Sequence, residues 1–283
     1  MELSVFYDHI LEAAHQTGKS TLEILKCCHA FGINGLEMNF SFFDKNKKNV
    51  CSELADSEMK ISCIYETFDF GKNKDISKGK RMIEAVAEIK APRILVIPGE
   101  IESWEAAELS ACSDSYDTTE QYMNQSASIQ NMQCALTELV EYATKTGIQV
   151  TLEDFDGFMH PFARINQLLW FMKHVQGLKY TLDMGNFSFS NEDVVKAADI
   201  LREYIVHVHC KDRKESQYVK GEFCKGLGQC AAGEGYIPIA KLVKYLKKSG
   251  YNGYLAIEHF GVQNQIVYIE KSANYLKKLI YPS

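Results

Sequence analysis

The sequence lacks the features that mark membrane, secreted and nucleic-acid-binding proteins. No apolar run approaches the roughly 20 residues that a helix needs to cross a bilayer. The first residues, MELSVFYDHILEAAH, contain no basic segment followed by an apolar core, so they do not read as a signal peptide. Basic residues are not in excess either, because the net charge is -6, which makes DNA a poor partner. We expect a cytoplasmic protein with no nucleic-acid or membrane partner.

Paired cysteine motifs are also missing. The chain has 9 cysteines, an odd number, and no Cys-x-x-Cys spacing. Disulfide frameworks and structural zinc sites depend on such paired cysteines. Several of the cysteines fall in predicted strands or on predicted helix faces. We therefore expect free, reduced and mostly buried thiols, which is typical of cytoplasmic proteins.

What the sequence does contain is a regular alternation of strand and helix patterns. Short apolar and β-branched runs predict eight strands, and helical periodicity fills the gaps between them. One helical stripe consists of Ile129, Met132, Leu136, Leu139, Val140 and Ala143, and Gly147 closes it. The predicted strands are residues 3–7, 35–40, 61–65, 93–98, 149–155, 179–183, 205–209 and 253–259.

This alternation predicts an α/β fold, a single (β/α)8 TIM barrel that spans residues 1–283 as one domain. Such barrels typically take about 250 residues, and 46% of this chain is hydrophobic, enough for a sizeable core. An open doubly wound sheet is the alternative. That fold usually carries a glycine-rich turn after its first strand, and YDHILEAAH has none.

The fifth to eighth predicted strands each end in a side chain that can bind a metal. They are Glu153 in VTLEDF, Asp183 in YTLDMG, His209 in HVHCKD and Glu258 in LAIEHF. In a parallel barrel the four side chains reach the same rim, which is the catalytic one. Carboxylate oxygen and imidazole nitrogen suit a divalent cation, and the crowded groups would repel each other without one. We predict one ion of Mn, Co, Mg or Zn. Any one of these residues taken alone could instead cap a helix or pair with arginine.

Three further polar residues are expected to support these strand ends. His207 faces the same side as His209 because side chains alternate along a strand, and we interpret it as an interior group rather than a ligand. Glu37 in GLEMNF would point into the barrel, where it needs a partner such as His207 or Lys211. Asp212 is expected to fix the end of the seventh strand.

These residues lie in segments that resemble the xylose-isomerase-like barrel superfamily over nearly the whole chain. This group includes sugar and sugar-phosphate isomerases and epimerases, inosose dehydratase, hydroxypyruvate isomerase and endonuclease IV. The resemblance implies a metal bound by Glu153, Asp183, His209 and Glu258. It also implies that Glu153 and Glu258 transfer protons through a metal-stabilised enediolate. The matching segments are FGINGLEMNF, GIQVTLEDF, LDMGN, HVHCKD, GEGYIP and YLAIEHF.

The resemblance therefore predicts an enzyme of carbohydrate metabolism, an isomerase or epimerase that acts on a small sugar, polyol or sugar phosphate. Asn186 stands where ketose 3-epimerases usually carry a histidine. Those enzymes also usually carry an arginine a few residues after the histidine of the seventh strand, and here Lys211 and Arg213 are near that position but not at it. A simple free-ketose 3-epimerase is therefore not favoured. The candidate substrate-binding residues are Tyr65, Trp104, Asn186, Lys211 and Arg213.

Other functions stay open beside this one. A lyase like inosose dehydratase would begin with the same removal of an α-proton. An enzyme like endonuclease IV is less favoured, because the ends of strands three, four and six and the loop after strand seven lack its extra histidines. A phosphate clamp could use Lys211, Arg213, Lys214, Lys220 and Lys225, although a solvated basic loop is the favoured interpretation. The sequence leaves open whether the chain forms a homo-oligomer.

Overall fold

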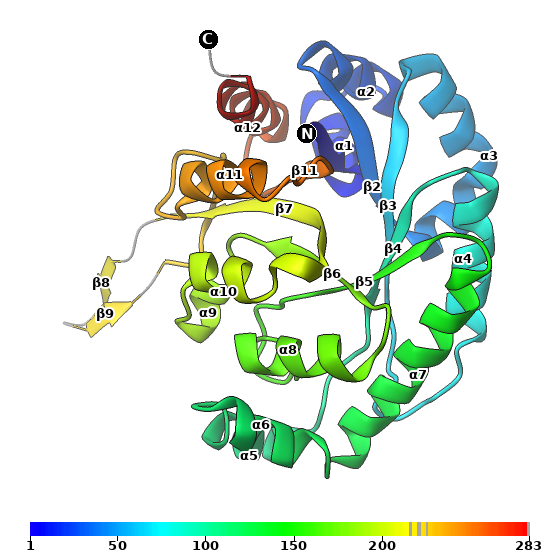
Figure 1. The fold of residues 1–283 in the computed structure, drawn as a ribbon. Helices are drawn as coiled ribbons and strands as arrows, with labels where there is room; N and C mark the ends of the chain where they lie inside the picture. The colour runs from blue at the N-terminus through cyan, green and yellow to red at the C-terminus, as the bar shows by residue number, and fades with distance from the viewer. Residues whose placement is uncertain (215–216, 220–221, 225, 282–283) are drawn as a thin grey trace. The chain divides into compact units, whose positions relative to one another are not determined.

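The computed structural model describes residues 1–214, 217–219, 222–224 and 226–281, and Figure 1 shows the order of its elements. The strands are β1 (Glu2–Phe6), β2 (Ile33–Asn39), β3 (Lys60–Thr67), β4 (Arg93–Ile97), β5 (Gln149–Glu153), β6 (Lys179–Asp183), β7 (Ile205–Arg213), β8 (Gln217–Val219), β9 (Glu222–Cys224), β10 (Gln229–Cys230) and β11 (Tyr254–Glu258). The helices are α1 (Tyr7–Thr17), α2 (Thr21–Ala30), α3 (Phe40–Ser57), α4 (Ser77–Glu88), α5 (Ser103–Ala111), α6 (Tyr116–Met123), α7 (Ala127–Thr144), α8 (Ile165–His174), α9 (Phe187–Ser190), α10 (Val194–Ile200), α11 (Ile239–Lys248) and α12 (Gln265–Ile280), with a 3-10 turn at Arg202–Tyr204.

The main sheet closes on itself. Its strand order is β10-β7-β11-β1-β2-β3-β4-β5-β6, and β7 also pairs with β6. The eight strands predicted from the sequence correspond to β1 to β7 and β11, and β10 is a short antiparallel addition to β7. The predicted (β/α)8 barrel is confirmed.

The residues group into two compact units, and the first contains Met1–Ser62, Asp183–Ser188 and His207–Ser283. Within it, β1 pairs in parallel with β2 and β11, and β11 pairs in parallel with β7. Buried strand residues such as Val5, Leu36 and Ile257 form its core. Helix α1 contacts α2 and α12. The ends of β7 and β11 therefore lie side by side.

The second unit contains Cys63–Leu182 and Phe189–Val206. Strands β3, β4, β5 and β6 pair in parallel in chain order. Helix α7 contacts β5 and α4, and α6 contacts α8. The Ser126 hydroxyl accepts the Ile129 amide at 3.3 Å and so caps the start of α7. All members of the apolar stripe predicted for this helix are buried.

The structure departs from the sequence predictions in the connections. Residues 100–124, for which no helix was predicted, contain α5 and α6. Strand β7 continues to Arg213, four residues past its predicted end. Farther on, β8 and β9 pair antiparallel. Apolar periodicity is weak in each of these segments, so no clear pattern predicts the elements that form there.

The described cysteines agree in part with the sequence prediction. Eight cysteines are free thiols, but only four are buried, fewer than expected. The side chain of Cys224 lies outside the described residues. Among the helices that the structure describes, none is long and apolar enough to span a bilayer.

Candidate metal centre

Three of the four predicted ligands come together in the first unit. Asp183 ends β6, Glu258 ends β11, and His209 lies in β7 opposite Ala256 of β11. Each offers a donor atom within 4.8 Å of the others. His209 Nδ1 lies 3.3 Å from Glu258 Oε2 and 4.0 Å from Asp183 Oδ2. All three side chains are buried, so the cluster is a closed set of two carboxylates and one imidazole.

A further carboxylate, Glu37 of β2, holds the other side of the histidine. His209 Nε2 lies 3.1 Å from both Glu37 oxygens, and His207 Nε2 lies 2.7 Å from Glu37 Oε2. Burial alone would raise the pKa of Glu37, but His209 and His207 more than offset it and hold the pKa well below its ordinary value. The predicted contact of Glu37 with His207 is confirmed. The contact with His209 was not predicted, and it leaves Nδ1 as the atom that faces Asp183 and Glu258.

Lys211 brings a cation to the same cluster. Its ammonium lies 2.6 Å from Glu258 Oε1 and 3.0 Å from Asp183 Oδ2, and it donates to Asn186 Oδ1 at 2.8 Å. Burial would raise the pKa of Glu258, but Lys211 and then His209 lower it well below its ordinary value. Because β7 is longer than predicted, Lys211 belongs to the strand and faces the same side as His209.

The turn after β6 packs against this part of β7. Asp183 Oδ1 accepts the amides of Gly185 at 2.6 Å and Asn186 at 2.9 Å. A side chain at Gly185 would meet the carbonyl oxygen of Lys211 at 2.8 Å, so the close approach requires glycine. Arg213 Nη2 donates to Asn186 Oδ1 at 3.2 Å. The predicted substrate-binding residues Asn186, Lys211 and Arg213 therefore lie together beside the ligands.

Asp212 points to the other side of β7 and has a structural role, as predicted. Its buried carboxylate accepts the amides of Gly233 at 2.8 Å, Gly235 at 3.0 Å and Ile237 at 3.1 Å. All three amides belong to the segment GEGYIP. The last residues of HVHCKD and the segment GEGYIP thus form one unit that fixes the end of β7.

The remaining candidate metal-binding and substrate-binding residues that the structure describes belong to the second unit. Glu153, at the end of β5, is buried in the second unit, and Tyr65 on β3 belongs to the same unit. Trp104 is 62% exposed on α5. The participation of these three residues in the site stays a prediction. Lys220 and Lys225 lie outside the described residues.

The side chains of the first unit fit a divalent cation. Glu258 Oε2 is buried and receives no hydrogen bond from the described part of the chain. Such an atom is costly without a partner, and an ion between it and His209 Nδ1 would supply one. Two carboxylates and an imidazole are the donors that Zn, Mn and Mg sites use. Metal-binding histidines commonly have a carboxylate bound to their other ring nitrogen, and Glu37 is in this position relative to His209.

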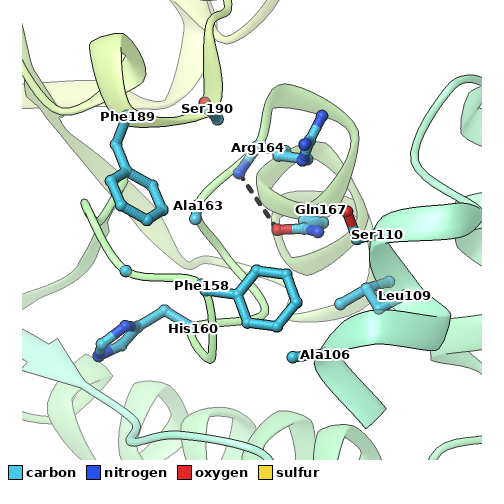
Figure 2. A pocket seen from close by; sticks show the side chains of 11 residues that line it. Ala106, Leu109, Ser110, Phe158, His160, Ala163, Arg164, Gln167, Phe189 and Ser190 are labelled. Atoms are coloured by element: carbon cyan, nitrogen blue, oxygen red, sulfur yellow. Dashed lines mark hydrogen bonds between the residues drawn. The ribbon is translucent and has the colours of Figure 1, made fainter. Parts of the chain in front are cut away.

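The second unit contains a cavity that the sequence did not predict (Figure 2). Its volume is about 280 Å³, and it is bounded by α5, the segment after β5, the start of α8 and α9. The rings of Phe158 and Phe189 lie around it and are 54% and 41% exposed. Burial lowers the pKa of His160, which also lines the cavity. These segments all follow carboxyl ends of strands, where barrels place their binding residues.

The fold is an α/β barrel with a cluster of side chains that could hold a metal ion, and sequence comparison places it in a family. Residues 25–279 match the family described as xylose isomerase-like TIM barrel. The chain belongs to this family. No curated protein sequence matches the chain.

Solved structures with the same fold include several kinds of enzyme. The probable 3-DHS dehydratase AsbF of Bacillus anthracis is 17% identical, with full coverage of both chains and a TM-score of 0.70. The IOLI protein with a binding zinc atom is 17% identical, with 99% and 98% coverage and a TM-score of 0.71. A D-tagatose 3-epimerase-like protein is 19% identical, with 99% and 98% coverage and a TM-score of 0.70.

Proposed function

We propose that the protein is a divalent-metal-dependent isomerase or epimerase of a sugar or sugar phosphate. One observation carries the proposal: Asp183, His209 and Glu258 converge, and Glu37 turns His209 Nδ1 toward the two carboxylates. Membership of the xylose isomerase-like family supports it. So do the names of similar structures, which include a D-tagatose 3-epimerase-like protein and a protein with a bound zinc atom.

We propose Asp183, His209, Glu258 and Glu153 as the ligands of one ion. Glu153 is included because it is buried at the carboxyl end of β5, which pairs with β6, the strand that Asp183 ends. A divalent ion held there would polarise the substrate carbonyl and stabilise negative charge on its oxygen. Zinc, manganese, cobalt and magnesium all accept such donors.

In the proposed reaction, one glutamate takes a proton from the substrate and another gives one back. Glu258 is ionised, because Lys211 lowers its pKa, and its carboxylate takes the proton from the carbon next to the carbonyl. The electron pair of the broken C–H bond moves to the carbonyl oxygen and gives an enediolate. Glu153 starts the cycle protonated and delivers its proton to the opposite face, which gives an epimer. Delivery to the neighbouring carbon, with transfer of the hydroxyl proton from one substrate oxygen to the other, gives an isomer, and exchange with solvent returns both glutamates to their starting states. Lys211, Asn186 and Arg213 are placed to bind substrate hydroxyls.

Exchange of solvent deuterium tests this proposal. The protein is incubated in D2O with manganese and a panel of sugars, polyols and sugar phosphates, and the products are read by NMR. We expect deuterium at the carbon next to the carbonyl. We expect a loss of about 10²–10⁴-fold in exchange rate for Glu258→Gln, and no loss for Glu234→Gln, a change in an exposed pair with Lys271. Full turnover by Glu258→Gln would remove that residue from the chemistry.

A dehydratase is the second candidate. The similarity to the probable 3-DHS dehydratase AsbF over the full length of both chains favours it. Elimination would begin with the same proton removal and continue with loss of a β-hydroxyl as water. Mass spectrometry of the products separates the two functions, because only elimination gives a product that is lighter by one water.

A further inference from the structure

The first unit contains a second cavity, next to the metal centre. It has a volume of about 460 Å³ and lies between the residue that follows β7, strand β10, the loop after β11 and helix α12. Lys214, Gln229, Gln263 and Tyr268 contribute polar side chains, and none of the lining residues is acidic. In a chain with a net charge of -6, a neutral-to-cationic cavity of this kind favours an anionic ligand.

Lys214 supplies the positive charge. Its side chain is exposed, and the carbon stem of that side chain lies 3.6 Å from the position that a Cβ atom would take at Gly228. The nearby Lys271 differs, because its ammonium lies 2.7 Å from Glu234 while resting 5.8 Å from the ring centre of Tyr268. Lys271 is thus paired with a carboxylate, whereas Lys214 lines the cavity.

The loop after β11 adds backbone donors. Gly261 has a φ of +72°, in the left-handed region, and Gly261 and Gln263 both line the cavity. The amides of these two residues donate no hydrogen bond to the described part of the chain. Backbone amides in a turn with left-handed residues commonly bind anions. Two amides and an ammonium match the several acceptor oxygens of a phosphate.

The cavity is close enough to the metal centre to share a substrate with it. Phe260, in its wall, follows the ligand Glu258 by two residues, and its ring lies 5.6 Å from that of Phe6. The Phe6 ring in turn lies 5.0 Å from that of His209. Lys214 follows the end of β7 and comes three residues after Lys211, so the Cα atoms of the two lysines lie at most about 10 Å apart. An extended pentose phosphate, from its carbonyl oxygen to its outer phosphate oxygens, is of about this length.

We propose that this cavity binds the phosphate of a phosphorylated substrate whose carbonyl end lies at the metal centre. This inference rests on the proposed function and narrows its substrate class to sugar phosphates. Barrels often bind phosphate with the loops that follow their seventh and eighth strands, and here those strands are β7 and β11. Lys214 acts as a point charge on the phosphate oxygens, and the loop amides fix their position.

Binding of inorganic phosphate tests the inference directly. Phosphate is titrated by calorimetry into the wild-type protein, first with manganese and then after treatment with a chelator, which removes any contribution of the ion. We expect one phosphate per chain in both conditions. Lys214→Met should weaken binding at least about tenfold. Lys241→Met removes an exposed lysine of α11 that does not line the cavity, and it should leave the affinity unchanged.

The outcomes also separate this inference from the proposed function. Equal phosphate affinity in Lys214→Met and wild type, or no binding at all, overturns the inference, even if unphosphorylated sugars exchange deuterium and the proposed function stands. Phosphate binding that depends on Lys214 supports the inference even if no substrate exchanges deuterium, in which case the proposed function fails. As a second readout, Lys214→Met should raise KM for ribulose 5-phosphate and leave that for ribulose unchanged.

Discussion

The Glu37 carboxylate of β2 holds Nε2 of His209 on β7, with 3.1 Å to each of its oxygens. This contact directs Nδ1 of the same ring toward Glu258 and Asp183. It also joins two strands whose contacting residues are 172 positions apart. The orientation of the one imidazole in the centre is therefore set by a residue that is not itself a predicted ligand.

Replacing Glu37 should weaken metal binding. In Glu37→Gln a neutral amide takes the place of the carboxylate, so His209 is held less firmly and is a poorer ligand. We expect a loss of about 10–100-fold in affinity for manganese or zinc, measured by calorimetric titration. The matched control is Glu234→Gln on the surface, which should bind as the wild type does. Unchanged affinity in Glu37→Gln would show that the contact does not orient a ligand.

Removing Lys211 should destabilise the metal-free protein. Its ammonium is the cation beside Asp183 and Glu258, and without it two buried carboxylates are left close together. Breaking such a buried pair costs about 3–5 kcal/mol, and urea unfolding of Lys211→Met in chelator should show a loss of this order. Manganese should restore part of the loss, because the ion binds the folded state. A loss no larger than that of the exposed control Lys241→Met would contradict this account.

Replacing Asp212 should lower the stability of the fold without changing the affinity for the metal ion. In Asp212→Ala the amides of Gly233, Gly235 and Ile237 lose their buried acceptor. We expect the free energy of unfolding to fall by more than about 3 kcal/mol, while the folded fraction still binds one ion with wild-type affinity. Glu234→Ala, an exposed change in the same segment, serves as the control. If Asp212→Ala instead abolished metal binding in folded protein, Asp212 would belong to the metal centre.

His160, in the cavity of Figure 2, should make the protein sensitive to mild acid. Burial lowers the pKa of this imidazole from 6.5, so the folded protein keeps it neutral while the unfolded chain takes up a proton. The free energy of unfolding should therefore fall as the pH drops below about 6.5, by at most about 1.4 kcal/mol per pH unit.

Chemical denaturation over a series of pH values checks this expectation. His160→Gln should flatten the pH dependence below about 6.5, whereas His15→Gln, a change at an exposed histidine of α1, should not. The same slope in the wild type and in His160→Gln would assign the acid sensitivity to other groups.

The strands of the barrel could be predicted because parallel strands are buried on both faces and appear as continuous apolar runs. Strand β7 was predicted too short because its last residues, Lys211 to Arg213, are polar and interrupt the apolar run. They are polar because they face the metal centre or hold the next segment. Helices α5 and α6 were missed because few of their residues are buried, among them Ala106, Leu109 and Met123. Strands β8 and β9 have three residues each, too few for a periodic signal.

The candidate ligands could be predicted because strand ends of a parallel barrel meet at one rim. Three of the four are brought together in the first unit, and the alternation in GLEMNF correctly placed Glu37 inside. Its partner His209 could not be predicted, because nothing local in the sequence indicates which of two inward histidines a distant carboxylate reaches. The cavity beside Lys214 could not be predicted either, since it depends on how the loop after β11 lies against β10 and α12.

Metal stoichiometry is the most direct test of the central claim, that these strand ends hold a single divalent ion. Elemental analysis and calorimetry should find one ion per chain in the wild type and in His15→Gln, and none retained after dialysis in His209→Gln. A wild-type protein that binds no divalent ion, or a His209→Gln variant that retains the ion as tightly as the wild type, would contradict the account.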